Sequence, residues 1–143
     1  MDYPLDFDLA WVAGDADDCI GVFITAGLGP MARTQFERSS EMRIDIEAEL
    51  LMLPRITGCD LLVDVPAPSS YVDLAERGFF VFDWFDQNID TYRLVAKPSS
   101  PLRSADIESD LRMLVALAKL EFFFVDCSTI GTFGGVEMLT HAE

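Results

Sequence analysis

The sequence contains little of what catalysis or metal binding requires. It has one His, His141, and three Cys, Cys19, Cys59 and Cys127, which are widely spaced and odd in number. Zinc sites need Cys and His at short, regular spacing, and Ser–His or Cys–His catalysis would have to use His141 as its base. We interpret His141 as an exposed tail residue. The composition predicts a protein that is not an enzyme and that binds no metal ion and no cofactor.

Basic residues are also scarce. Ten Lys and Arg stand against twenty-five Asp and Glu, which gives a formal net charge of −15. Such a charge repels nucleic acids and anionic membranes and attracts basic surfaces. The few basic residues form no patch along the chain. We therefore expect no nucleic acid and no membrane among the partners.

No apolar run reaches the length of about 18–20 residues that spans a bilayer. Residues 1–6 are acidic and lack a small-residue cleavage site, so they do not read as a secretory signal. The odd number of Cys favours free thiols in a reducing compartment over a disulfide framework. The expected location is the cytoplasm.

Apolar and aromatic residues are plentiful. The hydrophobic fraction is 50%, with eleven Phe, three Tyr and two Trp. A chain of this length with this composition can bury a substantial core. We expect one domain over residues 1–143, in which residues 128–143 form a tail of uncertain order.

Alternating apolar residues predict two hairpins. The first joins residues 7–13 and 19–25 through an acidic turn, and the second joins residues 79–85 and 91–97. In the second hairpin one strand is apolar on both faces, with Phe80, Phe82 and Trp84 on one face and Phe79, Val81 and Phe85 on the other. This pattern is typical of a central strand. A last strand is expected at residues 121–126. Residues 61–65 fit either a buried strand or a packed loop.

Helical spacing appears in three places. The helices expected are residues 42–53, ended by Pro54, residues 71–77, closed by Gly78, and a third helix capped by Ser104. The apolar stripe of the third helix is Ile107, Leu111, Leu114, Val115 and Ala118. The fold class predicted is α+β, with a mostly antiparallel sheet of about five strands packed on one face by two to three helices. The sheet would consist of the two hairpins and the C-terminal strand.

Two motifs resemble known binding loops. Residues 27–32 match the pattern G-x-G-x-x-A of dinucleotide sites, with Glu47 and Glu49 at a suitable distance. We expect the next helix to start only near Ser40, so we interpret the motif as a Gly/Pro loop. Residues 15–18 could offer carboxylates to a cation, but the distal Glu of a calcium loop is missing. An acidic hairpin turn is the preferred interpretation.

Acidic residues also surround the end of the second hairpin. Asp83 and Asp86 flank Trp84 and Phe85, and Asp90 lies across the turn. A carboxylate pair in an aromatic cleft is one arrangement used in glycoside hydrolysis. Aromatic side chains rimmed by acids also form docking sites for basic proteins. We favour recognition over catalysis here.

The second hairpin carries a family resemblance. It lies in the stretches Gly78-Phe79-Phe80-Val81-Phe82-Asp83-Trp84, Tyr92-Arg93-Leu94-Val95-Ala96-Lys97-Pro98 and Pro101-Leu102, and it continues through residues 107–120 and 122–124. These segments resemble small, largely uncharacterised bacterial proteins of the immunity type from polymorphic toxin systems. The resemblance covers about the last 60 residues and rests on structural, hydrophobic positions. It implies an acidic cytoplasmic protein that binds over the active site of a toxin domain.

The expected function is therefore an acidic, non-enzymatic binding protein that neutralises a basic protein partner such as a toxin domain. The residues expected to bind the partner lie at the two predicted turns: Asp15, Asp17, Asp18, Asp83, Trp84, Asp86 and Asp90. Two alternatives remain open. One is a small enzyme or ligand-binding domain with a cleft beside Trp84, and the other is a structural subunit that forms a homodimer through its apolar strand faces.

Overall fold

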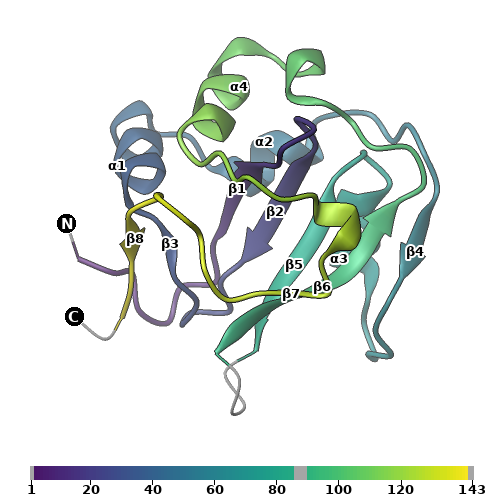
Figure 1. The fold of residues 1–143 in the computed structure, drawn as a ribbon, viewed down its shortest axis with the longest axis horizontal. Helices are drawn as coiled ribbons and strands as arrows, with labels where there is room; N and C mark the ends of the chain where they lie inside the picture. Colours follow the sequence, from purple (N-terminus) through teal and green to yellow (C-terminus); the bar gives the residue numbers. More distant parts are fainter. Residues whose placement is uncertain (1, 86–89, 142–143) are drawn as a thin grey trace.

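The computed structural model describes residues 2–85 and 90–141. Helices, short 3-10 turns and strands alternate along the chain (Figure 1). The helices and 3-10 turns are α1 (Arg33–Met42), α2 (Ile46–Leu51), α3 (Ser69–Ala75), η1 (Ser104–Asp106), α4 (Ser109–Ala116) and η2 (Phe124–Asp126). The strands are β1 (Ala10–Gly14), β2 (Ile20–Ile24), β3 (Met31–Ala32), β4 (Cys59–Leu61), β5 (Phe80–Phe85), β6 (Thr91–Pro98), β7 (Thr129–Ile130) and β8 (Met138–Leu139).

The main sheet has the strand order β1-β2-β5-β6-β4, and β7 adds to β6. Both predicted hairpins are present, as β1–β2 and β5–β6, and all pairs in this sheet are antiparallel except β2–β5. The parallel pair joins the two hairpins into one sheet. The predicted α+β class and mostly antiparallel sheet are confirmed. Of residues 61–65, only Leu61 belongs to a strand, the short edge strand β4, and residues 62–65 form a loop whose Val63 packs on the core.

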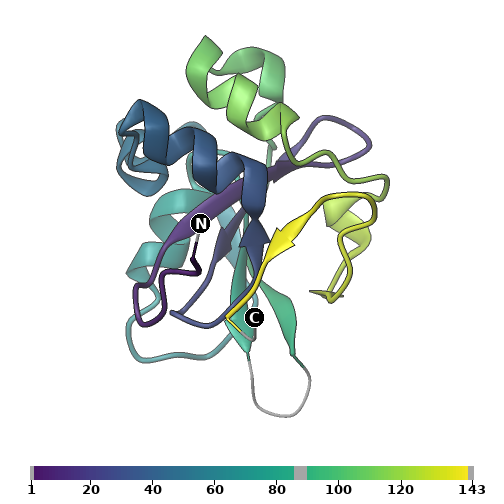
Figure 2. The same ribbon diagram turned by 90° about the vertical axis from the view of Figure 1, so that its left-hand side faces the viewer.

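Strand β5 is central, as its two apolar faces predicted. Phe80, Phe82 and Trp84 pack into one hydrophobic cluster, while Phe79, Val81 and Phe85 pack into the other. Side chains from α2, α3 and α4 cover the second cluster. Residues 118–139 cover the first, mostly without regular structure. Helices α2, α3 and α4 thus lie on the opposite side of the sheet from this C-terminal segment (Figure 2).

The helix expected over residues 42–53 is wrong in its bounds. α1 begins at Arg33, and α2 starts after a break at Arg43, whose φ of 57° is left-handed. The physical reason is a cap: the Asp45 side chain accepts a hydrogen bond from Ala48 N and begins a new helix. The expectation that the helix starts near Ser40 is therefore corrected.

The last helix is also capped differently from the prediction. Ser104 begins η1, and the Glu108 carboxylate caps α4 by accepting hydrogen bonds from Asp110 N and Leu111 N. The apolar stripe predicted for this helix is buried as expected. The helix predicted over residues 71–77 is present as α3 but begins and ends two residues earlier, and Gly78 closes the turn after it at a positive φ of 102°.

The strand predicted at residues 121–126 is wrong. The segment contains η2, and the Phe124 side chain is buried in the core while Phe123 and Val125 point towards solvent. The alternation of a strand is present, but the segment pairs with no strand in the described part of the chain. In the segment beyond it, β7 pairs with β6 and β8 pairs with β3.

The second half of the outer edge of β1 is closed by groups from outside the sheet. Gly14 N donates to Ala118 O at 3.0 Å, and Leu120 N donates to Gly14 O at 2.8 Å. The fully buried Gln35 amide bonds to both backbone groups of Val12. The edge is therefore covered over its second half. No helix formed by the described residues has the length and apolar character needed to cross a membrane.

Candidate functional site

The two acidic turns lie at opposite ends of the sheet. Residues 15–18 connect the end of β1 to the start of β2. Because β2 and β5 run parallel, β5 starts at that same end and finishes at the other (Figure 1). The predicted binding residues therefore form two separate groups, Asp15, Asp17 and Asp18 at one end, and Asp83, Trp84 and Asp90 at the other. Asp86 lies outside the described residues.

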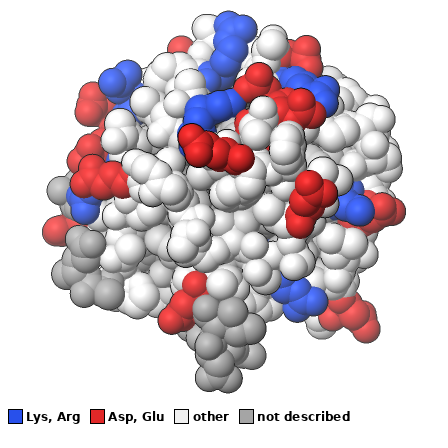
Figure 3. All heavy atoms as spheres, viewed as in Figure 1, with Lys and Arg blue, Asp and Glu red and all other residues white. Residues whose placement is uncertain are grey.

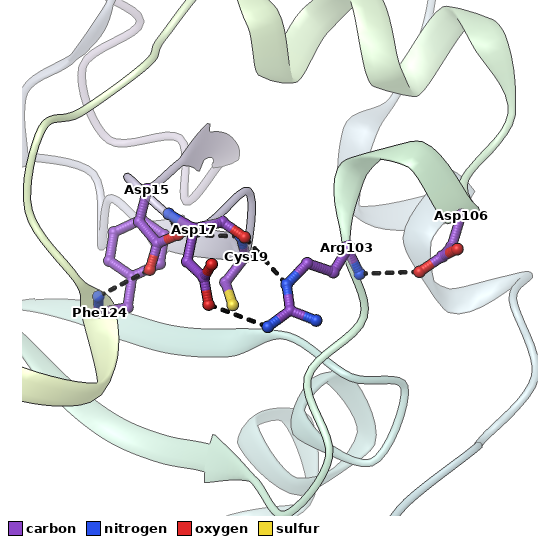
Figure 4. A network of polar contacts seen from close by, with 6 residues as sticks. All are labelled: Asp15, Asp17, Cys19, Arg103, Asp106 and Phe124. Carbon is purple, nitrogen blue, oxygen red and sulfur yellow. Dashed lines mark hydrogen bonds and ion pairs between the residues drawn. The ribbon is translucent and has the colours of Figure 1, made fainter.

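The Asp15 carboxylate is buried and holds neighbouring backbone segments together. Its residue is 2% exposed, and its carboxylate accepts hydrogen bonds from three backbone N–H groups. Oδ1 accepts from Asp17 N and Cys19 N, both at 2.9 Å, and Oδ2 accepts from Phe124 N at 2.9 Å (Figure 4). The carboxylate thus closes the hairpin turn and fixes the C-terminal segment to it.

Asp17 and Asp18 are exposed and each has a basic neighbour. Arg103 donates through its Nη2 to Asp17 Oδ2 at 2.9 Å and through its Nε to Asp17 O at 2.9 Å (Figure 4). Lys119 Nζ donates to Asp18 Oδ1, and this hydrogen bond lowers the pKa of Asp18. Both pairs are on the surface, where such ion pairs contribute little stability.

Asp83 is half-buried at the far end of the sheet. The Tyr71 hydroxyl donates to its Oδ2, and its Oδ1 has no hydrogen-bond partner within the described ranges. Burial raises the pKa of Asp83, and the Asp8 carboxylate raises it further. Trp84 packs its ring against Tyr92, with ring centroids 5.1 Å apart, and contacts Gly29. Asp90 is exposed, with a φ of 52°.

The glycines of the G-x-G-x-x-A motif have structural roles. Gly27 has a φ of 81°, which favours glycine. A Cβ on Gly29 would lie 2.6 Å from Tyr92 Oη and 2.9 Å from Trp84 Cβ. The motif continues into β3 before α1 begins. A close approach of aromatic side chains therefore accounts for the second glycine.

An acidic group missed by the sequence analysis lies beside the start of β1. Asp8, Asp45 and Glu47 line one hollow of about 340 Å³. Burial raises the pKa of Glu47, with further contributions from Asp8 and Asp45. Asp8 comes from the segment before β1, whereas Asp45 and Glu47 come from the start of α2. No local pattern relates these segments, so only the fold reveals the group.

The structure also exposes apolar side chains at the other edge of the sheet. Phe123 is 47% exposed and Val125 60% exposed, and they line a hollow of about 510 Å³ beside β4. Val125 also lines a neighbouring hollow of about 350 Å³ that Leu62 borders. We call the surface formed by Leu61, Leu62, Phe123 and Val125 the η2–β4 surface.

A further hollow of about 650 Å³ lies between the end of α4 and residues 132–137. Its apolar lining is Leu117, Leu120, Phe122, Phe133 and Val136, and its polar lining includes Lys119, Glu121 and Glu137. Among residues 2–85 and 90–141, no group of three or more His, Cys, Asp or Glu side chains is arranged to hold a metal ion. Cys19, Cys59 and Cys127 are free thiols, as predicted, and burial raises the pKa of each.

No protein-family model, no curated protein and no solved structure matches this chain.

Proposed function

We propose that this protein binds a basic protein partner and blocks it, as an immunity protein blocks a toxin domain. The observation that carries the proposal is the net charge of −15 on a folded domain of 143 residues. Basic side chains that form ion pairs with the chain's own carboxylates are Arg33, Arg55, Arg103 and Lys119. These ion pairs engage part of the few basic residues in the chain. The electrostatic potential at the surface therefore stays strongly negative and steers basic proteins towards the domain.

The η2–β4 surface supplies the apolar contact for such a partner. Exposed large apolar side chains beside hollows, with charged residues around them, are typical of docking sites. Asp17, Asp60 and Asp126 line the two hollows here, together with Arg93, Lys97 and Arg103. On the face that the C-terminal segment crosses, charged side chains lie mostly around the periphery of an uncharged area (Figure 3). A partner with an apolar anchor and charged flanks of both signs fits this arrangement, and the net charge of the whole domain favours a basic one.

The proposed location is the cytoplasm. Free thiols are typical of a reducing compartment, and the three cysteines are unpaired. A cytoplasmic inhibitor of this kind would meet its basic partner before that partner reaches its own target.

The experiment has two stages. Tagged protein captures partners from a lysate of its own host at low and at moderate salt, and a captured basic protein is then purified and its dissociation constant measured. We expect stoichiometric binding whose association slows as salt rises. Co-expression with the partner should also remove any growth defect that the partner causes alone.

Phe123→Ala tests the η2–β4 surface. Truncation of a central aromatic anchor should weaken binding by about 30-fold. Phe7→Ala is the matched control, because Phe7 is also an exposed aromatic residue, at 66% exposure, but lies before β1. Equal affinities of both variants and the unmodified protein would remove the η2–β4 surface from the proposal. A partner that binds equally well at both salt concentrations would contradict the electrostatic basis of the proposal.

A second candidate function is small-molecule binding in the 650 Å³ hollow at the end of α4. Its volume falls in the range of ligand sites, and apolar and polar side chains line it in equal measure. A ligand there should raise the melting temperature of the protein, and Leu120→Ala should reduce that increase.

A further inference from the structure

The first half of the outer edge of β1 is open. Thr25 N donates to Leu9 O at 2.8 Å, so the backbone C=O of Leu9 points towards β2. Along a strand, the backbone groups of successive residues point alternately to one neighbour and to the other. The backbone groups of Ala10, Val12 and Gly14 therefore point away from β2. Val12 and Gly14 have the partners described above. Within the described ranges, Ala10 has none, so its N–H and C=O face outwards unpaired.

Ala10 borders the hollow of about 340 Å³ between the start of β1 and the connection from α1 to α2. This volume is near the lower end of the range for binding sites, which suits one or two side chains of a longer segment. Leu9, Met31, Phe36, Ile44 and Ile46 form its apolar wall. A free strand edge beside such a hollow is the arrangement used for adding an extended peptide to a sheet.

The charged residues that line this hollow indicate which kind of peptide segment would bind there. Asp8, Asp45 and Glu47 line the hollow, and Arg43 is the basic side chain that lines it. Burial is the largest cause of the raised pKa of Glu47, and the nearby Asp8 and Asp45 carboxylates raise it further. Asp8 also contributes to the raised pKa of Asp83. A cation placed among these carboxylates would reduce their mutual repulsion.

We propose that the open edge of β1 binds an extended, basic segment of a partner protein as an added strand. The segment's backbone pairs with Ala10, and a Lys or Arg side chain enters the hollow towards Asp8 and Glu47. The inference stands apart from the proposed function, because the η2–β4 surface lies at the opposite edge of the sheet.

Charge also argues against a second copy of this chain as the occupant. Strand pairing between two β1 edges would bring two copies of Asp8, Asp45 and Glu47 together on proteins of net charge −15. Like charges at such an interface oppose association.

The test uses a fluorescent peptide of alternating arginine and valine, with blocked ends, whose binding is followed by anisotropy at low salt. A second peptide carries an N-methyl group at every residue and keeps the same charge without any N–H. We expect the first peptide to bind and the methylated one to bind at least about threefold more weakly, since it cannot donate to Ala10 O.

Variants of the protein separate the backbone contact from the charge contact. Ala10→Pro removes the outward N–H, and because Ala10 opens β1 with its N–H away from β2, the fold tolerates proline there. This variant should bind about two- to tenfold more weakly. Glu47→Gln should weaken binding severalfold, whereas Asp64→Asn, an exposed position beyond β4, should not. Circular dichroism confirms that each variant is folded.

Three outcomes would overturn the proposal. One is the absence of peptide binding. Another is equal binding of both peptides to the unmodified protein, which would mean that charge alone acts. The third is a dimer, seen by sedimentation, that excludes the peptide and dissociates in Ala10→Pro, because a second copy would then occupy the edge.

Discussion

The Gln35 side chain pairs with the Val12 backbone as a neighbouring strand would. Gln35 Oε1 accepts from Val12 N at 2.8 Å, and its Nε2 donates to Val12 O at 2.7 Å. Nε2 also donates to Leu114 O at 2.8 Å, which connects β1, α1 and α4. One amide thus satisfies three buried backbone groups.

Gln35→Ala should strongly destabilise the protein. The substitution leaves the N–H and C=O of Val12 without partners and removes one of the two hydrogen bonds that Leu114 O accepts, which we expect to lower the free energy of unfolding by about 3 kcal/mol. Urea unfolding measures the change. Thr34→Ala, at an exposed neighbouring position, should change it by less than about 0.5 kcal/mol. Similar values for both variants would show that the amide contributes little.

Asp15→Ala should also destabilise the protein, by about 3 kcal/mol. The substitution removes the acceptor for the N–H groups of Asp17, Cys19 and Phe124, and bonds to a charged acceptor are stronger than neutral ones. Asp15→Asn retains one acceptor oxygen and should lose less. Asp110→Asn, exposed on α4, is the surface control for urea unfolding. Unchanged stability in Asp15→Ala would contradict the structural role.

Asp83 should make stability depend on pH. Because burial raises its pKa in the folded state, the folded protein holds this proton at a pH where the unfolded chain has lost it. Stability therefore falls as pH rises through that window, above the ordinary range of a carboxyl group. Asp83→Asn should be more stable than the unmodified protein at pH 7, and this advantage should shrink towards pH 4. Urea unfolding across this range gives the comparison, and a constant difference would contradict it.

Ala26→Gly should stabilise the protein. Ala26 has a φ of 52°, a left-handed conformation that is unfavourable for a residue with a Cβ. Glycine removes this strain but increases the freedom of the unfolded chain, so the net gain should be about 0.5–1 kcal/mol. Ala67→Gly, in an exposed loop, should instead be destabilising. A thermal melt of both variants tests the difference in sign.

Local sequence predicted the parts of the fold that local forces determine. Both hairpins and the central position of β5 followed from alternation and turn residues. The parallel pairing of β2 with β5 did not, because it joins segments that no turn connects. The break between α1 and α2 depends on the Asp45 cap, which has a recognisable local signal that the apolar stripe outweighed.

The candidate site was harder to predict from the sequence than the fold was. Asp15 reads as a turn residue, and its role becomes visible only because Phe124, far away in the chain, brings a backbone N–H to its carboxylate. The aromatic run around Phe124 has the composition of a strand but pairs with no strand in the described part of the chain. The acidic hollow beside Ala10 combines three segments and likewise requires the fold.

The covering of the sheet by residues 118–139 affects how the protein is made. Trp11, Phe23 and Phe82 lie in the cluster that this segment buries, and all are translated before it. While the ribosome still holds residues 118–139, the nascent sheet presents an uncovered aromatic face to the cell. Chaperones that bind exposed aromatic segments should therefore engage this chain during synthesis and release it once Phe124 reaches Asp15.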